Sequence, residues 1–269
     1  MFPPFIRSHF YKLKMIREFA KKREERMQTS VKKPKVSIII PTYNCSYVDQ
    51  AIISALNQTY PNKEIIVIDD GSSREFDKVI PYLNFIRYYW KPNRGTGSAL
   101  NLGIEHANGD YFTWLSSDDL YEPDKIEKQV EFMLTNNLDV SYTNYSFIDT
   151  NSHVTGVSVG LHFTSKKDFY NRMKTFCHIN GCTVMMTMDL IKKVGLFNED
   201  LRYTQDFEYW LRVIQHYDFH FCDEPLVKYR VHSESESFKS ADVQLQEIDQ
   251  LNQQYRQILD ELIRKEGET

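Results

Sequence analysis

Short apolar runs alternate with segments of helical periodicity from residue 35 to about residue 146. The apolar runs are bounded by turn residues and predict strands at 36–40, 64–68, 85–90, 111–115 and 140–145. Between them, apolar positions recur three or four residues apart and predict helices at 47–57, 74–83, 97–107 and 123–135. This alternation is typical of an α/β domain whose parallel, doubly wound sheet has right-handed crossovers.

The pattern is looser beyond residue 146. It predicts helices at 165–176, 206–216 and 241–265, and strands at 182–187 and 226–231. We therefore expect a basic amphipathic leader at 1–33, an α/β domain at 34–238 and a C-terminal helix at 239–269. Apolar residues on one side of that helix are explained equally by packing on the domain or by packing on a partner, as in a homodimer. They are Leu245, Ile248, Tyr255, Leu259 and Leu262.

The leader differs in charge from the rest of the chain. Residues 1–35 carry 11 Lys and Arg against three Glu, a net +8, which leaves −12 for the remainder of a chain of net charge −4. Its apolar positions, which include Ile6, Phe10 and Leu13, form one broad side. Such a segment is typical of helices that lie on anionic lipid. Packing on protein and a frayed tail are the alternatives for residues 1–30.

Composition narrows the class of protein. An acidic body argues against nucleic-acid binding, which requires clustered Lys and Arg. The four cysteines show no metal-type or redox-type spacing, which favours a reducing compartment. We find no secretory h-region and no apolar window near the roughly 18 residues of a membrane span. We expect a cytoplasmic protein, peripheral on the inner face of the cell membrane if the leader binds lipid.

Two acidic pairs follow predicted strands. Asp69-Asp70 comes after the run at 64–68, and Asp118-Asp119 comes after the run at 111–115. Ligands of open α/β sheets bind beyond the carboxyl ends of the strands. Carboxylates gathered there repel one another unless a cation or a sugar hydroxyl lies between them. The pairs therefore predict a site for a metal-bound, phosphate-bearing ligand, although one pair alone would suit an ordinary turn.

The order of several short motifs resembles the family-2 glycosyltransferases, which are inverting enzymes of the GT-A fold. The motifs are Val36-Ser37-Ile38-Ile39-Ile40-Pro41-Thr42-Tyr43-Asn44, Asp69-Asp70-Gly71-Ser72, Asn101-Leu102-Gly103-Ile104, Ser117-Asp118-Asp119 and Gln205-Asp206. The resemblance covers roughly residues 34–235. It implies a Rossmann-like, mostly parallel sheet with flanking helices. It also implies transfer of a hexosyl group from a nucleotide-sugar, most simply a UDP-sugar, to an acceptor hydroxyl in polysaccharide or cell-surface glycan biosynthesis.

The resemblance also assigns nucleotide-binding residues. Pro41, Thr42, Tyr43 and Asn44 end the first strand, where free backbone groups would bond a base or ribose; a plain strand-to-helix turn is the alternative. Asp70 would accept from a uracil N–H, whereas we expect Asp69 to brace the turn. Arg94 and Gly95 precede a helix whose N-terminus suits a phosphate, and these glycines would also serve a simple turn.

A divalent ion, Mg²⁺ or Mn²⁺, would bind at the second acidic pair. The resemblance implies Asp119 as the direct metal ligand and Asp118 as a ribose or water-mediated metal contact. Ser116 replaces an acid that many family members carry, so affinity for the metal without nucleotide should be weak. A helix N-cap is the alternative for Asp119. His232 would be a metal ligand or phosphate donor and Arg230 a diphosphate contact, with a structural histidine as the alternative.

Asp206 is similar in position to the family's catalytic base. A carboxylate that removes the acceptor proton during attack contributes typically 10²–10⁴-fold to the rate. Glu208 is the local competitor, and a purely capping role is the alternative for Asp206.

Three other functions are less consistent with the sequence than glycosyl transfer. A Rossmann oxidoreductase would need a Gly-x-Gly-x-x-Gly turn after the first strand, which Pro41–Cys45 lacks. A non-catalytic nucleotide-sugar-binding protein would result if Asp206 pointed away from the site. A sugar nucleotidyltransferase shares the sheet architecture but should show a Gly-rich, basic first loop. The expected partners are a nucleotide-sugar donor and a glycan or lipid-linked acceptor, with no nucleic acid.

Overall fold

The computed structural model describes residues 33–233, 235 and 241–267. The chain divides into two units, Met1–Pro34 and Lys35–Thr269. The predicted leader at 1–33 lies, apart from Lys33, outside the described residues. Among the residues that are described, no helix is both long enough and apolar enough to cross a membrane.

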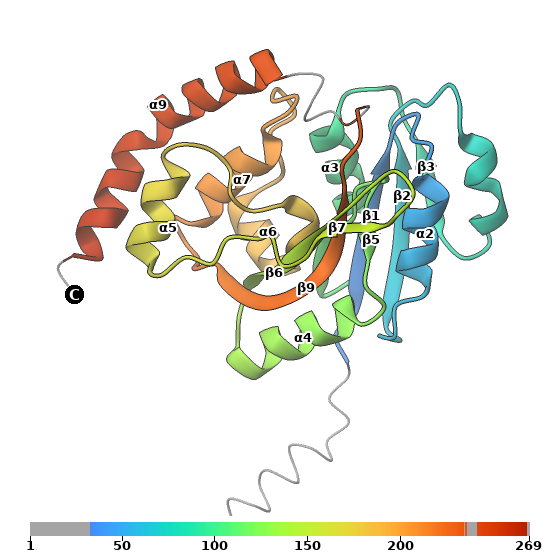
Figure 1. The fold of residues 1–269 in the computed structure, drawn as a ribbon, viewed down its shortest axis with the longest axis horizontal. Coiled ribbons are helices and arrows are strands. Elements are labelled where there is room, and N and C mark those ends of the chain that lie inside the picture. Colours follow the sequence, from blue (N-terminus) through green and yellow to red (C-terminus); the bar gives the residue numbers. More distant parts are fainter. Residues whose placement is uncertain (1–32, 234, 236–240, 268–269) are drawn as a thin grey trace, which may run out of the picture. The chain divides into compact units, whose positions relative to one another are not determined.

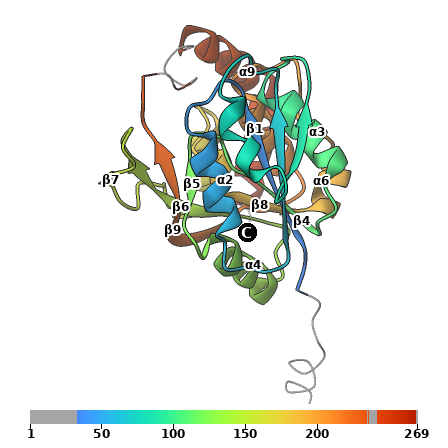
Figure 2. The same cartoon turned by 90° about the vertical axis from the view of Figure 1, so that its right-hand side faces the viewer.

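A mixed sheet of nine strands forms the centre of the second unit, counted over the described residues (Figure 1). Its order is β3-β2-β1-β4-β8-β6-β9-β5, and β7 pairs with β6 off this path. Figure 2 shows β7 standing off the end of the β6 strand. The strands are β1 (Val36–Thr42), β2 (Lys63–Asp69), β3 (Arg87–Trp90), β4 (Tyr111–Trp114), β5 (Leu120–Tyr121), β6 (Val140–Ile148), β7 (Val154–Gly156), β8 (Val184–Thr187) and β9 (His220–Arg230).

The first half of the sheet is parallel, as predicted, because β2, β1 and β4 lie side by side in one direction. All seven residues of β1 are buried, since helices cover both faces of such a sheet. Beyond β4 the sheet is mixed and departs from the simple parallel order that the alternation of strands and helices predicts. The apolar strand β8 inserts antiparallel between β4 and β6, and β6 then pairs in parallel with β9. A strand buried on both faces gives no sequence signal of its direction.

Helices flank this sheet on both sides. They are α2 (Val48–Leu56), α3 (Thr96–His106), α4 (Lys125–Asn136), α5 (Lys166–Met173), α6 (Met188–Val194), α7 (Gln205–Val213) and α9 (Ala241–Lys265). The helix predicted at 74–83 is absent and two 3-10 turns, Phe76–Lys78 and Ile80–Tyr82, replace it. Pro81 lies inside the predicted segment, where it removes a backbone donor and clashes with the preceding turn.

The motif at 101–104 has a packing role. A Cβ on Gly103 would lie 2.5 Å from Cγ2 of Ile39, so only glycine lets α3 approach β1 this closely. The side chain of Asn101 donates to the carbonyl oxygen of Phe197 and accepts from its N–H, both at 2.9 Å. Together they fix the middle of α3 against the sheet and against the segment that precedes α7.

The C-terminal helix packs on the same unit. Leu251, Tyr255 and Leu259 of α9 are buried, and α9 contacts α5. Leu245 is exposed, so the predicted apolar side is only partly covered along the helix.

Candidate active site

The carboxyl ends of β1 and β2 meet at one edge of the sheet, where Thr42 pairs with Asp69. Asp69 accepts from the backbone N–H of Ser72 at 2.7 Å and from the hydroxyl of Tyr88 at 2.6 Å. These bonds confirm the expectation that Asp69 braces the turn. Asp69 therefore holds the loop after β2 instead of facing a ligand.

Asp70 anchors the loop in front of α3. Its carboxylate accepts from the ammonium of Lys91 at 2.5 Å, from the N–H of Gly95 at 2.7 Å and from the N–H of Arg94 at 3.0 Å. Gly95 has φ +92°, a conformation that an L side chain adopts only under strain. The loop before α3, which the sequence predicts to bind a phosphate, is thus hydrogen-bonded directly to Asp70, which the sequence predicts to contact the base.

The segment at 41–44 is less open than the sequence suggested. Pro41 and Thr42 lie buried inside β1, which ends two residues later than predicted. Asn44 has φ 49° and its side-chain oxygen accepts from the backbone N–H groups of Ser73 and Arg74. Of these four residues, Tyr43 has the exposed side chain, at 48%.

Asp118 and His232 form a pair at this edge. Oδ2 of Asp118 lies 3.0 Å from Nε2 of His232, and the two side chains are 27% and 10% exposed. The ring of Tyr47 meets the imidazole edge-on at 5.3 Å between centroids. His232 comes two residues after the end of β9, so the long last strand carries it to the acidic pair.

Asp119 faces the interior. Its side chain accepts from the N–H of Arg230 at 2.8 Å and from the thiol of Cys182 at 3.2 Å, and the residue is 1% exposed. Desolvation raises the pKa of this carboxyl well above its usual range, and the neighbouring Asp118 raises it further. This burial favours a structural role for Asp119, whereas the sequence predicts it as the direct metal ligand. Asp118 is the accessible member of the pair.

Arg230 is fully buried beneath this pair. Its guanidinium donates to the carbonyl oxygens of Asp118 and Asp149 at 2.8 and 2.9 Å and to the side chain of Gln50 at 2.9 Å. The guanidinium also lies 4.2 Å from the ring centroid of Tyr47. These protein partners already hold the buried side chain, which favours a structural role for Arg230 over the predicted diphosphate contact. Arg230 instead fixes the backbone that carries Asp118.

Asp206 lies in the first turn of α7. Its Oδ1 accepts from the N–H of Phe207 at 2.7 Å, and the backbone N–H of Asp206 itself also stabilises the carboxylate. Desolvation raises the pKa of this carboxyl to about 6. A carboxylate with a pKa near neutrality is suited to accept a proton.

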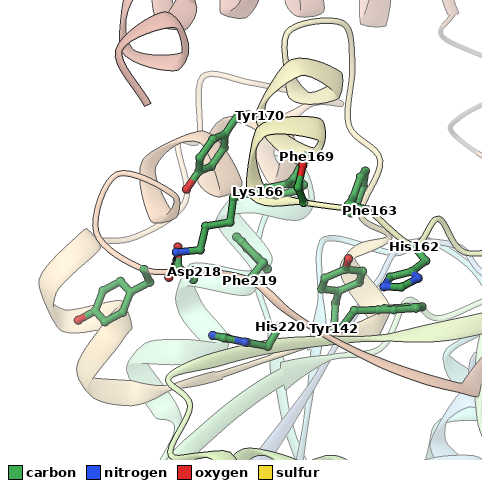
Figure 3. Close-up of a pocket in the computed structure, with 12 residues that line it drawn as sticks. Tyr142, His162, Phe163, Lys166, Phe169, Tyr170, Asp218, Phe219 and His220 are labelled. Atoms are coloured by element: carbon green, nitrogen blue, oxygen red, sulfur yellow. Dashed lines mark hydrogen bonds and ion pairs between the residues drawn. The ribbon is translucent and has the colours of Figure 1, made fainter. Parts of the chain in front are cut away.

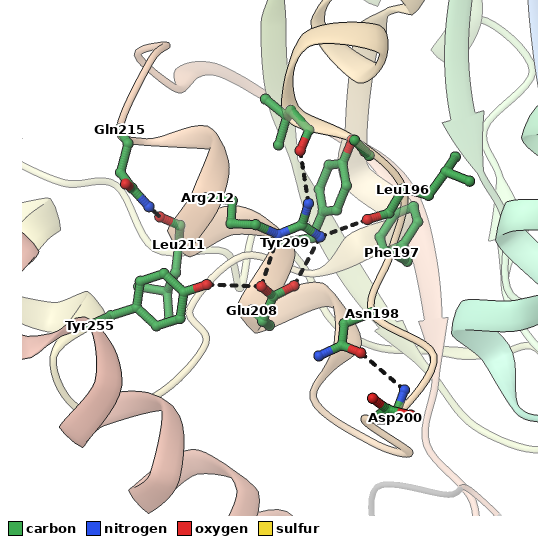
Figure 4. Close-up of polar contacts among 12 residues, drawn as sticks. Leu196, Phe197, Asn198, Asp200, Glu208, Tyr209, Leu211, Arg212, Gln215 and Tyr255 are labelled. Carbon is green, nitrogen blue, oxygen red and sulfur yellow. Dashed lines mark hydrogen bonds and ion pairs between the residues drawn. The ribbon is translucent and has the colours of Figure 1, made fainter.

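Glu208 does not share this property, as Figure 4 shows. Arg212 binds both of its oxygens, at 2.8 and 2.9 Å, and the hydroxyl of Tyr255 donates to Oε1 at 2.8 Å. The residue is buried. Glu208 therefore joins α7 to α9 and does not compete with Asp206 for an acceptor proton.

The starts of α3 and α7 lie against each other. A Cβ on Gly97 would meet the carbonyl oxygen of Asn198 at 3.2 Å and Cβ of Gln205 at 3.5 Å. A continuous path of contacts thus runs from Asp70 through the loop before α3 to the start of α7. Within the described residues no group of three or more His, Cys, Asp or Glu is placed to hold a metal.

Lys91 and Cys182 were missed from sequence. Lys91 directly follows β3. A lysine at the end of the strand beside β2 is a signal from which its pairing with Asp70 could have been predicted. Cys182 lies in a 3-10 turn, Gly181–Thr183. It contacts Asp119 although 63 positions separate the two residues, and no sequence motif indicates this contact.

Comparison with known proteins decides the family. The sequence model of Glycosyl transferase family 2 matches residues 37–195. The chain belongs to this family. It is 40% identical over 237 residues to the uncharacterized glycosyltransferase RT0329 of Rickettsia typhi, covering 84% of this chain and 72% of the relative. The family prediction made from the ordered motifs is confirmed.

One further relative and one solved structure carry more specific names. One is the Escherichia coli UDP-Glc:alpha-D-GlcNAc-diphosphoundecaprenol beta-1,3-glucosyltransferase WfgD, 32% identical over 184 residues, with 67% of this chain and 70% of that protein covered. The other is S. aureus TarS 1–349 in complex with UDP-GlcNAc, which superposes with a TM-score of 0.66 at 20% identity over 82% of this chain and 66% of TarS. The second likeness confirms the predicted GT-A type α/β fold.

Proposed function

We propose that this glycosyltransferase moves a sugar from a UDP-sugar to the hydroxyl of a lipid-linked glycan, with inversion at the anomeric carbon. The position of Asp206 in the first turn of α7 and its raised pKa carry this proposal. The names of WfgD and TarS support the uridine nucleotide, and the name of WfgD supports the diphosphate-lipid acceptor.

The reaction is a direct displacement. The acceptor oxygen forms a bond to the anomeric carbon while the bond from that carbon to the diphosphate oxygen breaks, and UDP leaves with the bonding electrons. Asp206 takes the hydroxyl proton, which makes the oxygen a competent nucleophile as attack proceeds. Attack from the face opposite the leaving group inverts the anomeric configuration.

Asp118 and His232 fit a divalent ion that takes its other ligands from the nucleotide and from water. Their donor atoms converge to 3.0 Å and remain partly open, and Mg²⁺ is usually bound by one or two carboxylates plus phosphate oxygens. When bound, such an ion supplies neutralisation of the charge on the departing diphosphate. The chain's own part is to hold Asp118 in place, which Arg230 does through the Asp118 carbonyl.

The nucleotide base is proposed to lie over Tyr43 and near Asp70. Tyr43 has an exposed ring at the end of β1. Asp70 is buried but belongs to the same loop assembly, so a uracil N–H would join the backbone donors of Arg94 and Gly95 on its carboxylate.

Transfer of radiolabelled sugar from UDP-glucose or UDP-N-acetylglucosamine to a diphosphoundecaprenyl glycan tests this function. Asp206→Asn should retain UDP binding and lose 10²–10⁴-fold in transfer, whereas the matched change Asp189→Asn, at an exposed position on α6, should have no effect. The anomeric configuration of the product, read by NMR, should be opposite to that of the donor. Undiminished transfer by Asp206→Asn, or retention of configuration, would refute the mechanism.

A further inference from the structure

A hollow lies where β6 and β9 begin (Figure 3). Ser141 pairs with His220 at these strand starts, whereas Ile148 pairs with Arg230 at the end that bears the active site. The hollow has a volume of about 260 Å³. Its walls come from the two strand starts, from α5 with the loop before it, and from the loop after α7.

Two tyrosines of this hollow have polar groups without a protein partner. Tyr142 and Tyr170 are 5% and 4% exposed, and neither hydroxyl makes a hydrogen bond to any described residue. Figure 3 shows both hydroxyls directed into the hollow. The arrangement therefore provides two hydrogen-bonding groups for a molecule that enters the hollow.

Charged and aromatic groups complete the walls. Lys166 of α5 pairs with Asp218 at 2.6 Å, which places an ammonium and a carboxylate together at the rim. Phe219 and Phe221 are half-buried, and the imidazole of His162 stacks on the ring of Phe221 at 5.4 Å. Aromatic faces carry partial negative charge and attract weakly positive C–H groups.

We propose that this hollow binds one sugar unit of a glycan. A pyranose presents a C–H face to aromatic rings and, around its edge, hydroxyls that both donate and accept hydrogen bonds. The hydroxyls of Tyr142 and Tyr170 and the Lys166–Asp218 pair match that edge. The volume lies just below the ~300–1,000 Å³ typical of drug-sized ligands, which suits a sugar ring and excludes a whole nucleotide-sugar.

The hollow is separate from the reaction centre. Asp206 lies at the start of α7 and Phe219 follows its end, and a nine-residue helix spans about 13 Å. On the proposed function, on which this step rests, the hollow holds a unit of the acceptor glycan remote from the hydroxyl that reacts. Its sugar binding is nevertheless measurable without transfer.

Saturation-transfer NMR on the full chain, with glucose, N-acetylglucosamine, cellobiose and chitobiose as probes, tests the proposal. At least one probe should bind, and Tyr142→Phe and Tyr170→Phe should each weaken it about three- to tenfold, as expected for one lost hydrogen bond. Tyr82→Phe, the same change outside the hollow, should leave binding unchanged. Trp210 packs edge-on against Phe219 at 5.5 Å and provides a fluorescence readout.

Two results would overturn the proposal. One is that no probe binds the wild-type chain. The other is that binding survives unchanged in both tyrosine variants and in Lys166→Met, with the melting temperature of each variant retained. Asp206→Asn should bind the probes as the wild type does, so a failure of the proposed transfer reaction is distinguishable from a failure of this site.

Discussion

The carboxylate of Asp118 and the imidazole of His232 meet at 3.0 Å although 114 positions separate them in the chain. The neighbouring carboxylate of Asp119 points the other way, toward the thiol of Cys182 and the N–H of Arg230. Two adjacent acids therefore have opposite environments, one partly open and one buried. On the proposed function, this difference gives the metal contact to Asp118 and a structural role to Asp119.

The first prediction concerns this division. Asp118→Asn and His232→Gln should each raise the Mn²⁺ concentration for half-maximal transfer about tenfold or more, because each removes a donor from a sparse set. Asp119→Ala should instead lower the free energy of unfolding by about 1–3 kcal/mol, since it leaves the N–H of Arg230 unpaired. Metal titration and urea unfolding of the three variants separate the roles. A larger metal effect from Asp119→Ala than from Asp118→Asn would reverse the assignment.

The pH dependence of transfer should follow Asp206. The base must be ionised to accept a proton, and its pKa is raised to about 6. The rate kcat/KM should therefore rise with pH through about 6 and level off above it. Initial rates between pH 4.5 and 8.5 measure this profile. A rate that is flat across pH 6 contradicts the role.

The same shift predicts a gain in stability for an inactive variant. Burial raises the pKa of Asp206 in the folded chain, so the folded state binds the proton more tightly and loses stability as pH rises from about 4 to about 6. Asp206→Asn removes this cost, and its melting temperature should exceed that of the wild type at pH 7.5 but equal it near pH 4. Scanning fluorimetry at the two pH values checks the sign. Lower stability at pH 7.5 would indicate that Asp206 mainly caps α7.

Two arginines near the site should differ in how much they contribute to the stability of the fold. Arg230→Met should destabilise the fold by about 1–3 kcal/mol for each of the carbonyl groups of Asp118 and Asp149 that it leaves without a charged donor. Arg94 has a 69% exposed side chain and a loose 3.7 Å contact with Glu199, so Arg94→Met should change stability by no more than about 0.5 kcal/mol. Urea denaturation of both variants measures the contrast. Similar values for the two would refute the clamp assigned to Arg230.

The basic leader gives a prediction from sequence alone. Its net +8 over residues 1–35 and its apolar positions support attachment to anionic lipid. Deleting residues 1–30 should abolish sedimentation with phosphatidylglycerol-containing vesicles and leave UDP affinity unchanged. Sedimentation of the truncated chain equal to that of the full chain rules the attachment out.

The local patterns predicted many elements well. The buried run at 36–40 became the centre of the sheet, and α2, α3, α4 and α7 lie within the segments predicted for them or within one residue of them. The helix predicted at 74–83 is absent because Pro81 interrupts a segment whose apolar spacing is otherwise helical. The direction of the strands beyond β4 could not be predicted from the sequence. The antiparallel direction of β8 depends on the strands beside it, and the apolar pattern of its four residues does not encode that direction.

What the sequence determined by itself is the family, the GT-A fold and the presence of carboxylates at the ends of strands, because ordered motifs and apolar periods are local properties of the chain. Only the tertiary structure decided which carboxylates are open to a ligand. Asp119 and Glu208 look as available as Asp118 and Asp206 in the sequence, yet partners from distant segments, Cys182, Arg230 and Tyr255, surround the first two. Desolvation and hydrogen bonding are set by those distant partners, so the chemistry of an acid is decided only when the chain is folded.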